Sequence, residues 1–168
     1  MDELTQYLKT GKYIENELEQ ILNKKIIITE DHIKHINMPI SNFYGYNFNI
    51  ITLFEKYGYV FTDDDYILMI RKNGNIIEYI SKDKLTNNMC EIAVRQGGIL
   101  LRYIPSDKRT NELCKLAVQE NAYLIIFVPE DKKTEEICRI AFHQDNMVLP
   151  YIPDDKKYLF IKNEIMNI

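Results

Sequence analysis

Residues 110–133 have the sequence TNELCKLAVQENAYLIIFVPEDKK, and its pattern recurs with a period of 24 residues. Each copy begins with a threonine and ends near an aspartate–lysine pair: Thr62, Thr86, Thr110 and Thr134, then Asp83-Lys84, Asp107-Lys108, Asp131-Lys132 and Asp155-Lys156. Repeats of about 20 to 50 residues are typical of stacked architectures in which no repeat buries its apolar side alone. The sequence therefore predicts four tandem repeats over residues 62–157.

The first segment of each repeat has the features of an α-helix. The Thr110 hydroxyl can accept a hydrogen bond from a free amide of the first turn, and Glu112 suits the positive end of the helix dipole. Leu113, Leu116 and Ala117 recur at helical spacing. Residue types that tolerate a left-handed C-cap follow this segment, namely Asn73-Gly74, Gly97, Gly98, Asn121 and Asn146.

A second apolar segment follows at residues 100–104, 124–128 and 148–152, and a proline ends each one. Periodicity does not distinguish a short helix from a strand over this length, and a leucine-rich-repeat horseshoe also fits the period. No asparagine row with Leu-x-Leu spacing accompanies the segment, which favours two helices. We therefore expect an all-α fold, an α-solenoid of four two-helix repeats.

Two rows of equivalent residues are expected in the core. Cys90, Cys114 and Cys138 share one position beside small alanines. Equivalent positions of stacked helices lie roughly 8–10 Å apart, too far for a disulfide and too regular for a tetrahedral zinc site. We expect buried, reduced thiols. The aromatic row is also predicted to be core: Tyr79, Tyr103, Phe127 and Tyr151.

The two ends of the chain depart from the repeat. Residues 1–61 are expected to form an irregular helical region, with helices near residues 2–9, 12–23 and 47–57 and another beginning at Thr29. Gly58 should close the helix at 47–57. A degenerate ankyrin-like helix pair is conceivable over residues 29–61, although the Thr-Pro-Leu-His signature is absent. Residues 158–168 are expected to form a C-terminal capping helix.

Charge and hydropathy restrict the partners and the location. The net charge of -4 is spread evenly and no basic tract occurs, which disfavours a nucleic-acid partner. The start of the chain, MDELTQY, carries acids where a secretory signal needs a basic segment, and no apolar run approaches the roughly 18 residues that span a bilayer. We expect an intracellular protein without a membrane segment.

No pattern for chemistry is complete. His32 and His35 lie one turn apart near Asp31, but a third metal ligand is missing, so a solvated helix is expected there. The acids at 63–65 fit the helix dipole after Thr62. No phosphate-binding loop, nucleophile elbow or Cys-x-x-Cys pair occurs. The sequence predicts no enzyme activity, no cofactor and no metal.

The variable positions of the first helix are the candidate binding residues, because solenoids place recognition where side chains change on a fixed frame. One row holds Ile67, Glu91, Lys115 and Arg139, and the other holds Arg71, Arg95, Gln119 and His143. An ordinary polar outer face explains these rows equally well. We predict a protein–protein interaction scaffold. The alternative is a nucleic-acid-associated repeat module, and an unfamiliar hydrolase comes third.

The frame Thr-x-x-x-Cys-x-x-Ala-Val followed by Gly-x-Leu-x-x-Tyr-Ile-Pro, at residues 86–105, resembles short tandem repeats of unknown function in giant DNA viruses of amoebae and in some bacteria. The resemblance covers residues 62–157 and departs from the family pattern at Ala122 and Asn146, where glycine is expected. It implies a two-helix repeat and, for a viral protein, a location in the host cytoplasm. It implies no activity.

Overall fold

The computed structural model describes residues 2–10, 15–24, 26–36 and 50–157. Within these ranges every regular element is a helix and no strand occurs, which confirms the all-α class and leaves no place there for the horseshoe alternative. The chain divides into two compact units, the N-terminal unit Met1–Met89 and the C-terminal unit Cys90–Ile168.

The N-terminal unit begins with three short helices, α1 (Glu3–Lys9), α2 (Glu15–Leu22) and α3 (Glu30–His35). All three fall where the sequence predicts helices. Asp2 caps α1, because its Oδ1 accepts a hydrogen bond from the Thr5 backbone N–H at 2.8 Å. The apolar stripe of α2 is buried as expected, at Leu18, Ile21 and Leu22.

The next helix, α4 (Ile50–Lys56), is closed by Gly58 as predicted. Gly58 has a φ of 86°, in the left-handed region that favours glycine. The Tyr59 N–H donates to the Phe54 carbonyl and the Gly58 N–H to the Glu55 carbonyl, both at 3.0 Å, which is the Schellman pattern. Residues 37–49 and 158–168 lie outside the described residues, and with them part of the ankyrin-like pair and the whole C-terminal capping helix.

Each predicted repeat contains an α-helix followed by a 3₁₀ helix. The α-helices are α5 (Asp63–Lys72), α6 (Asn87–Gln96), α7 (Asn111–Glu120) and α8 (Glu135–Gln144). The 3₁₀ helices are η2 (Gly74–Glu78), η3 (Gly98–Tyr103), η5 (Ala122–Phe127) and η7 (Asn146–Tyr151), with the short connectors η4 (Ser106–Lys108) and η6 (Glu130–Lys132). The second segment is thus helical, with the tighter 3₁₀ winding.

The threonines cap the α-helices as predicted. In each repeat the threonine Oγ1 accepts a hydrogen bond from the backbone N–H three residues later, at 3.2 or 3.3 Å: Thr62, Thr86, Thr110 and Thr134. In α5 the buried Asp65 completes a capping box, since its Oδ2 accepts from the Thr62 N–H at 2.9 Å. Local hydrogen bonding therefore explains this acid.

The predicted left-handed C-caps are wrong. The residue after α5, α7 and α8 has extended backbone, with φ of -154° at Asn73, -152° at Asn121 and -154° at Asp145. Its side chain instead begins the 3₁₀ helix, as when Asn121 Oδ1 accepts from the Tyr123 N–H at 2.9 Å. One residue therefore ends the α-helix and caps the next element, which turns the chain sharply without a positive φ.

The core is built from one face of each 3₁₀ helix and from the cysteine row. Cys90, Cys114 and Cys138 are fully buried, as predicted. A 3₁₀ helix has three residues per turn, so residues three apart share a face. Leu101 and Ile104 share the core face of η3, and Ile125 and Val128 share that of η5.

The prediction that the aromatic row is core is wrong. Tyr79, Tyr103 and Phe127 are half-buried and Tyr151 is 44% exposed. Each aromatic lies two positions after the inward residue of its turn, on the flank of the 3₁₀ helix. The three-residue winding, which the sequence analysis did not assume, accounts for this placement.

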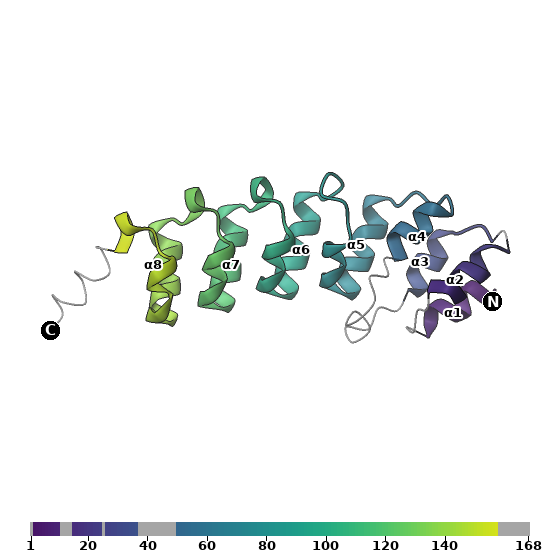
Figure 1. The fold of residues 1–168 in the computed structure, drawn as a ribbon, viewed down its shortest axis with the longest axis horizontal. Coiled ribbons are helices and arrows are strands. Elements are labelled where there is room, and N and C mark those ends of the chain that lie inside the picture. The colour runs from purple at the N-terminus through teal and green to yellow at the C-terminus, as the bar shows by residue number, and fades with distance from the viewer. Residues whose placement is uncertain (1, 11–14, 25, 37–49, 158–168) are drawn as a thin grey trace. The chain divides into compact units, whose positions relative to one another are not determined.

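In the C-terminal unit the two kinds of helix form adjoining layers. The helix α7 contacts η3 and η5, α8 contacts η5 and η7, and α7 and α8 lie side by side (Figure 1). Cations bridge successive 3₁₀ helices: Arg109 Nη1 donates to the Phe127 carbonyl at 2.6 Å, and Lys133 Nζ donates to the Tyr151 carbonyl at 2.9 Å. Each cation meets the negative end of the next 3₁₀ helix.

Candidate functional site

The candidate residues on the α-helices carry charges that are largely paired with neighbouring side chains. The ion pairs are Glu91 with Arg95 at 2.7 Å, Lys115 with Glu136, and Arg139 with Glu135. Exposed pairs of this kind contribute about 0–1 kcal/mol and are common on solvated helix faces. Their pairing lowers the charge that these rows present to a partner.

The other candidates are exposed but are not gathered into one site. Gln119 and His143 lie near the ends of α7 and α8, and the Gln119 backbone carbonyl accepts from Gln144 Nε2 at 3.0 Å. Ile67 and Arg71 belong to the N-terminal unit, whereas the other six residues of the two rows belong to the C-terminal unit. Within the C-terminal unit the structure brings Glu91 and Arg95 together, whereas Lys115 and Arg139 pair with carboxylates outside the predicted set.

The exposed apolar side chains of the 3₁₀ helices are a feature that the sequence analysis missed. Among the described residues, five of the seven large apolar side chains that are exposed lie on η3, η5 and η7. Three of them occupy the same position in successive repeats: Ile99 is 41% exposed, Tyr123 41% and Met147 68%. Exposure at one position in three consecutive repeats indicates a surface rather than scattered residues.

A second exposed row lies three residues later, at Arg102, Ile126 and Pro150. Ile126 is 50% exposed. Because residues three apart in a 3₁₀ helix lie above one another, each pair shares one face of its helix. We call this surface the 3₁₀ face, made of Ile99, Arg102, Tyr123, Ile126, Met147 and Pro150.

The 3₁₀ face is almost without charge. The sequences of η3, η5 and η7 are GILLRY, AYLIIF and NMVLPY, so Arg102 is their sole ionisable group apart from tyrosine hydroxyls. The Arg102 guanidinium lies 4.4 Å from the centre of the Tyr103 ring, and its Nη2 contacts the Tyr103 hydroxyl. The ring therefore holds the one cation at the η3 end of the face.

Hydrogen bonds beneath the 3₁₀ face fix the position of each 3₁₀ helix relative to the next repeat. The Glu120 carboxylate accepts from the Gly98 N–H at 2.7 Å, which ties the end of α7 to the start of η3. Arg109 also donates from Nε to the Ile104 carbonyl at 2.7 Å, in addition to its bond to Phe127. These hydrogen bonds join consecutive repeats. They hold in place the 3₁₀ backbone that bears the exposed side chains.

The signal for this face is present in the sequence at a period of three. In residues 122–127, AYLIIF, every position is apolar, which hides the distinction between inward and outward residues. Alignment of the three segments gives Ile, Tyr and Met at the second position and Arg, Ile and Pro at the fifth. Had a 3₁₀ winding been assumed, these two positions would have been assigned to one face.

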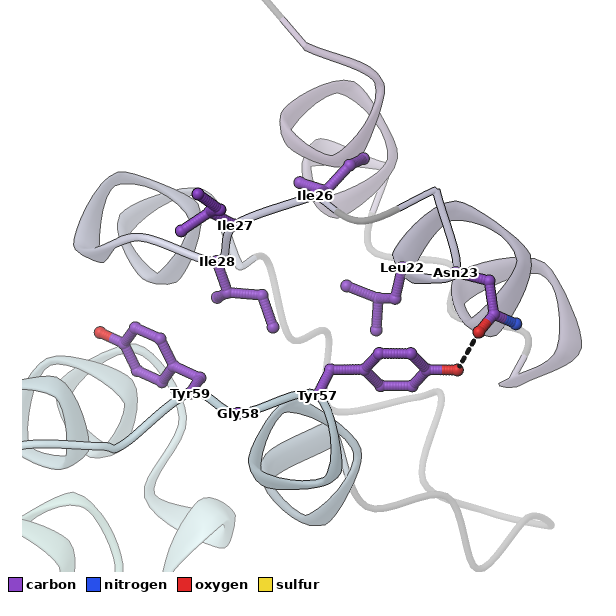
Figure 2. A pocket seen from close by; sticks show the side chains of 8 residues that line it. All are labelled: Leu22, Asn23, Ile26, Ile27, Ile28, Tyr57, Gly58 and Tyr59. Carbon is purple, nitrogen blue, oxygen red and sulfur yellow. Dashed lines mark hydrogen bonds between the residues drawn. The ribbon is translucent and has the colours of Figure 1, made fainter.

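The N-terminal unit has a separate pocket of about 370 Å³ (Figure 2). Two segments line it, Leu22, Asn23 and residues 26–28 on one side and Tyr57, Gly58 and Tyr59 on the other. Leu22 and Ile28 point toward the tyrosines, whereas Ile27 points away and is 81% exposed (Figure 2). The lining is mostly apolar.

Both tyrosine hydroxyls of this pocket have hydrogen-bond partners. The Tyr57 hydroxyl donates to Asn23 Oδ1 at 2.9 Å, and the Tyr59 hydroxyl donates to Asp65 Oδ2 at 3.0 Å. Burial, reinforced by Asp65, raises the pKa of Tyr59, so this hydroxyl stays protonated. The lining side chains suit an apolar group better than a charged one.

The expectation of a solvated His32 is wrong. Its side chain is buried, with Nδ1 accepting from the Thr29 N–H at 2.9 Å and Nε2 lying 3.2 Å from Asp2 Oδ1. Since Nδ1 accepts, Nε2 carries the proton and donates to Asp2. His35 contacts the Asp31 carbonyl instead. Across the described ranges, no three His, Cys, Asp or Glu side chains gather as a metal site requires.

The thiols of Cys90, Cys114 and Cys138 are buried away from solvent. Burial raises the pKa of Cys114 and of Cys138 to about 11, and that of Cys90 is raised by the same cause. The Cys138 thiol lies 3.6 Å from the Lys133 carbonyl, and the Cys114 thiol lies 3.8 Å from the Arg109 carbonyl. A protonated, buried thiol is a poor nucleophile.

Comparisons with protein-family models, with curated proteins and with solved structures gave no significant match. In the part of the chain that the structure describes, no helix has the length and apolar character needed to cross a bilayer.

Proposed function

We propose that this chain is a non-enzymatic helical-repeat scaffold that binds a protein partner through the 3₁₀ face. The observation that carries the proposal is the exposure of Ile99, Tyr123 and Met147 at one position of three consecutive repeats. Protein interfaces have an apolar centre enriched in aromatic residues and methionine and depleted in charge, and this face has that composition.

The proposal includes the stacking of all four repeats into an α-solenoid. Within the C-terminal unit, η3, η5 and η7 contact in order, and the same capping bonds recur at Thr62 in the first repeat. A common local design supports a common stacking mode. The solenoid would act as a frame that presents one side chain per repeat at regular spacing.

A nucleic acid is the second candidate partner, and the charge distribution argues against it. Binding to phosphates depends on several accessible cations. The 3₁₀ face has one, Arg102, while Arg95, Lys115 and Arg139 pair with carboxylates.

We propose an intracellular location as well, because three buried cysteines without a disulfide suit a reducing compartment.

Selection of a random peptide display library on the full-length chain tests the proposal. Enriched peptides should lose affinity by about tenfold or more for the double variant Tyr123→Ser/Ile126→Ser, since truncated apolar contacts at an interface centre cost about 1–2 kcal/mol each. The matched control is Gln119→Ser/His143→Ser, two exposed side chains on the α-helices.

The control separates the 3₁₀ face from the residues predicted from sequence. Binding that survives Tyr123→Ser/Ile126→Ser but is lost in Gln119→Ser/His143→Ser would move the site to the α-helix rows. Thermal unfolding of both variants should match that of the parent within a few degrees, because all four side chains are exposed.

A further inference from the structure

We infer that the partner of the 3₁₀ face is an amphipathic α-helix whose apolar residues recur every seven positions and whose end nearest Arg102 carries a carboxylate. The inference rests on the proposed function and adds to it the conformation, spacing and charge of the bound segment. Three features of the C-terminal unit favour such a partner: the spacing of its repeats, the composition of the face and the position of its one cation.

The spacing of the repeats favours a helical partner. Packed helices such as α7 and α8 lie roughly 8–10 Å apart, so equivalent side chains of successive repeats are separated by about that distance. An α-helix rises about 1.5 Å per residue, and seven residues span about 10.5 Å and nearly two full turns. One apolar side chain every seven residues can therefore meet Ile99, Tyr123 and Met147 in turn.

The breadth of the face also fits a helix. Each repeat offers two exposed positions one 3₁₀ turn apart, such as Tyr123 and Ile126. An amphipathic helix buries a stripe that includes the third or fourth residue after each anchor, which would contact the second position. Two rows on the face thus match the two rows of a helical stripe.

The charge of the face gives the partner a direction. No carboxylate pairs with Arg102 among the described residues, and the guanidinium is exposed. It has five N–H donors, of which Nη2 is directed at the Tyr103 hydroxyl. The stacked ring orients the remaining donors, so a carboxylate of the partner can bind as a planar, bidentate pair.

The other end of the face has no cation to match, and the Asp145 carboxylate lies beside the Tyr123 hydroxyl there. Tyr123, Ile126, Met147 and Pro150 offer apolar contact and one hydroxyl. An acidic residue at that end of the partner would lose hydration without a cation in return. A single acid at the Arg102 end therefore specifies which way the helix lies.

A display library of helical peptides tests this inference on the full-length chain. The peptides have fixed leucines at every seventh position and randomised residues elsewhere, and they are selected in parallel on the parent, on Arg102→Glu and on the charge-matched control Arg71→Glu. Selection on the parent and on Arg71→Glu should enrich Asp or Glu at one end. Selection on Arg102→Glu should enrich Lys or Arg at the same end.

Purified peptides give the size of the effect. An acid-ended peptide should bind the parent at least about tenfold more tightly than its Lys-ended counterpart, and Arg102→Glu should reverse that order, as measured by fluorescence anisotropy. Selected peptides without a charge bias, or with one that Arg102→Glu leaves unchanged, would overturn the inference while the proposed function stands.

Two outcomes would instead overturn the proposed function. One is that every selected peptide keeps its affinity for Tyr123→Ser/Ile126→Ser. The other is that an oligothymidine strand binds the chain more tightly than any peptide and loses that affinity steeply with added salt, which would make the partner a nucleic acid.

Discussion

The two units stabilise their helix ends in different ways. In the N-terminal unit the helices α1, α3 and α4 have end contacts of their own, such as the Asp2–His32 hydrogen bond at α1 and α3 and the left-handed Gly58 after α4, and the recurring threonine cap begins only at Thr62. In the C-terminal unit a single set of contacts recurs, with a threonine at each helix start and a cation bridging to the next repeat at Arg109 and Lys133.

This difference between the units determines whether the effect of a substitution can be compared with that of an equivalent substitution elsewhere in the chain. A change at the ends of α1, α3 or α4 removes a contact that has no equivalent elsewhere, so its effect has no internal reference. A change in the C-terminal unit has an equivalent position in the next repeat, where the same side chain role occurs in a different environment. Paired substitutions can therefore test whether the repeats are equivalent in energy as well as in structure.

The largest effect is expected in the 3₁₀ core. Ile125 is fully buried, whereas its equivalent one repeat later, Leu149, is half-buried. Ile125→Ala should lower the free energy of unfolding by about 3 kcal/mol through lost transfer energy and a cavity, and Leu149→Ala by about 1–2 kcal/mol. Urea unfolding followed by far-UV circular dichroism measures both. Equal losses would indicate that Leu149 is as well packed as Ile125.

The next effect concerns the close approach of η3 to α7. A Cβ added to Gly98 would lie 2.9 Å from the Ala117 Cα and 2.9 Å from Leu124 Cδ1. Because one of these atoms is backbone, Gly98→Ala should cost about 1–3 kcal/mol. The neighbouring Gly97→Ala is the control, since its nearest contact would be 3.9 Å away and its backbone is extended. Gly97→Ala should leave the thermal unfolding midpoint within about 2 °C of the parent.

A Gly98→Ala midpoint equal to that of Gly97→Ala would contradict this contact. The next repeat gives an independent check, because Ala122 occupies the equivalent position and is buried there. The contact of η3 with α7 thus excludes a methyl group at Gly98, whereas the equivalent position of η5 accommodates the methyl group of Ala122. Ala122→Gly should therefore not be stabilising.

The repeat made much of the fold predictable. The threonine caps and the helix starts are predictable from four aligned copies and the buried cysteines from three, since a structural requirement that recurs leaves the same residue type at each copy. The helix end at Gly58 was predictable for a different reason, because glycine has a conformation that few residues share. The N-terminal helices followed from caps and apolar spacing.

The candidate site was not predicted, because its signal is weak in physical terms. An α-helix and a 3₁₀ helix over the second segment differ only in which apolar residues face inward. Every residue of AYLIIF is apolar, so the sequence does not distinguish the two. Buried His32 was missed because its partner Asp2 is 30 residues away in the chain. Contacts of that kind depend on tertiary packing, which local sequence does not specify.

The bridging cations should have an intermediate effect. Lys133 is buried and donates to the Tyr151 carbonyl and to Glu130, whereas its neighbour Lys132 is half-buried and lies 3.4 Å from the Ser106 carbonyl. Lys133→Met keeps the aliphatic stem and removes the donor, which should cost about 1–2 kcal/mol. Lys132→Met should cost less than about 0.5 kcal/mol.

Chemical denaturation at neutral pH compares the two variants. A loss in Lys133→Met no larger than that in Lys132→Met would show that the bridge between consecutive 3₁₀ helices does not contribute to stability. Arg109→Met at the preceding junction should resemble Lys133→Met if the repeats are energetically equivalent, because it removes the same bond to the Phe127 carbonyl.

The smallest effect per residue is a loss of stability at high pH, which arises in the C-terminal unit because all three cysteines lie there. Burial raises the pKa of Cys114 and Cys138 to about 11 from an ordinary value of 9.0. The unfolded chain therefore ionises first as the pH rises, so each thiol's contribution is complete below pH 9 and decreases between pH 9 and 11. At pH 10 the expected loss is about 1 kcal/mol per thiol.

Unfolding of the parent and of Cys114→Ala/Cys138→Ala at pH 8 and pH 10 measures this loss. The parent should lose more stability than the variant over this interval, because lysine and tyrosine titrations are common to both and cancel in the difference. Parallel losses would mean that these thiols ionise equally in the folded and unfolded chain, and that water reaches the cysteine row.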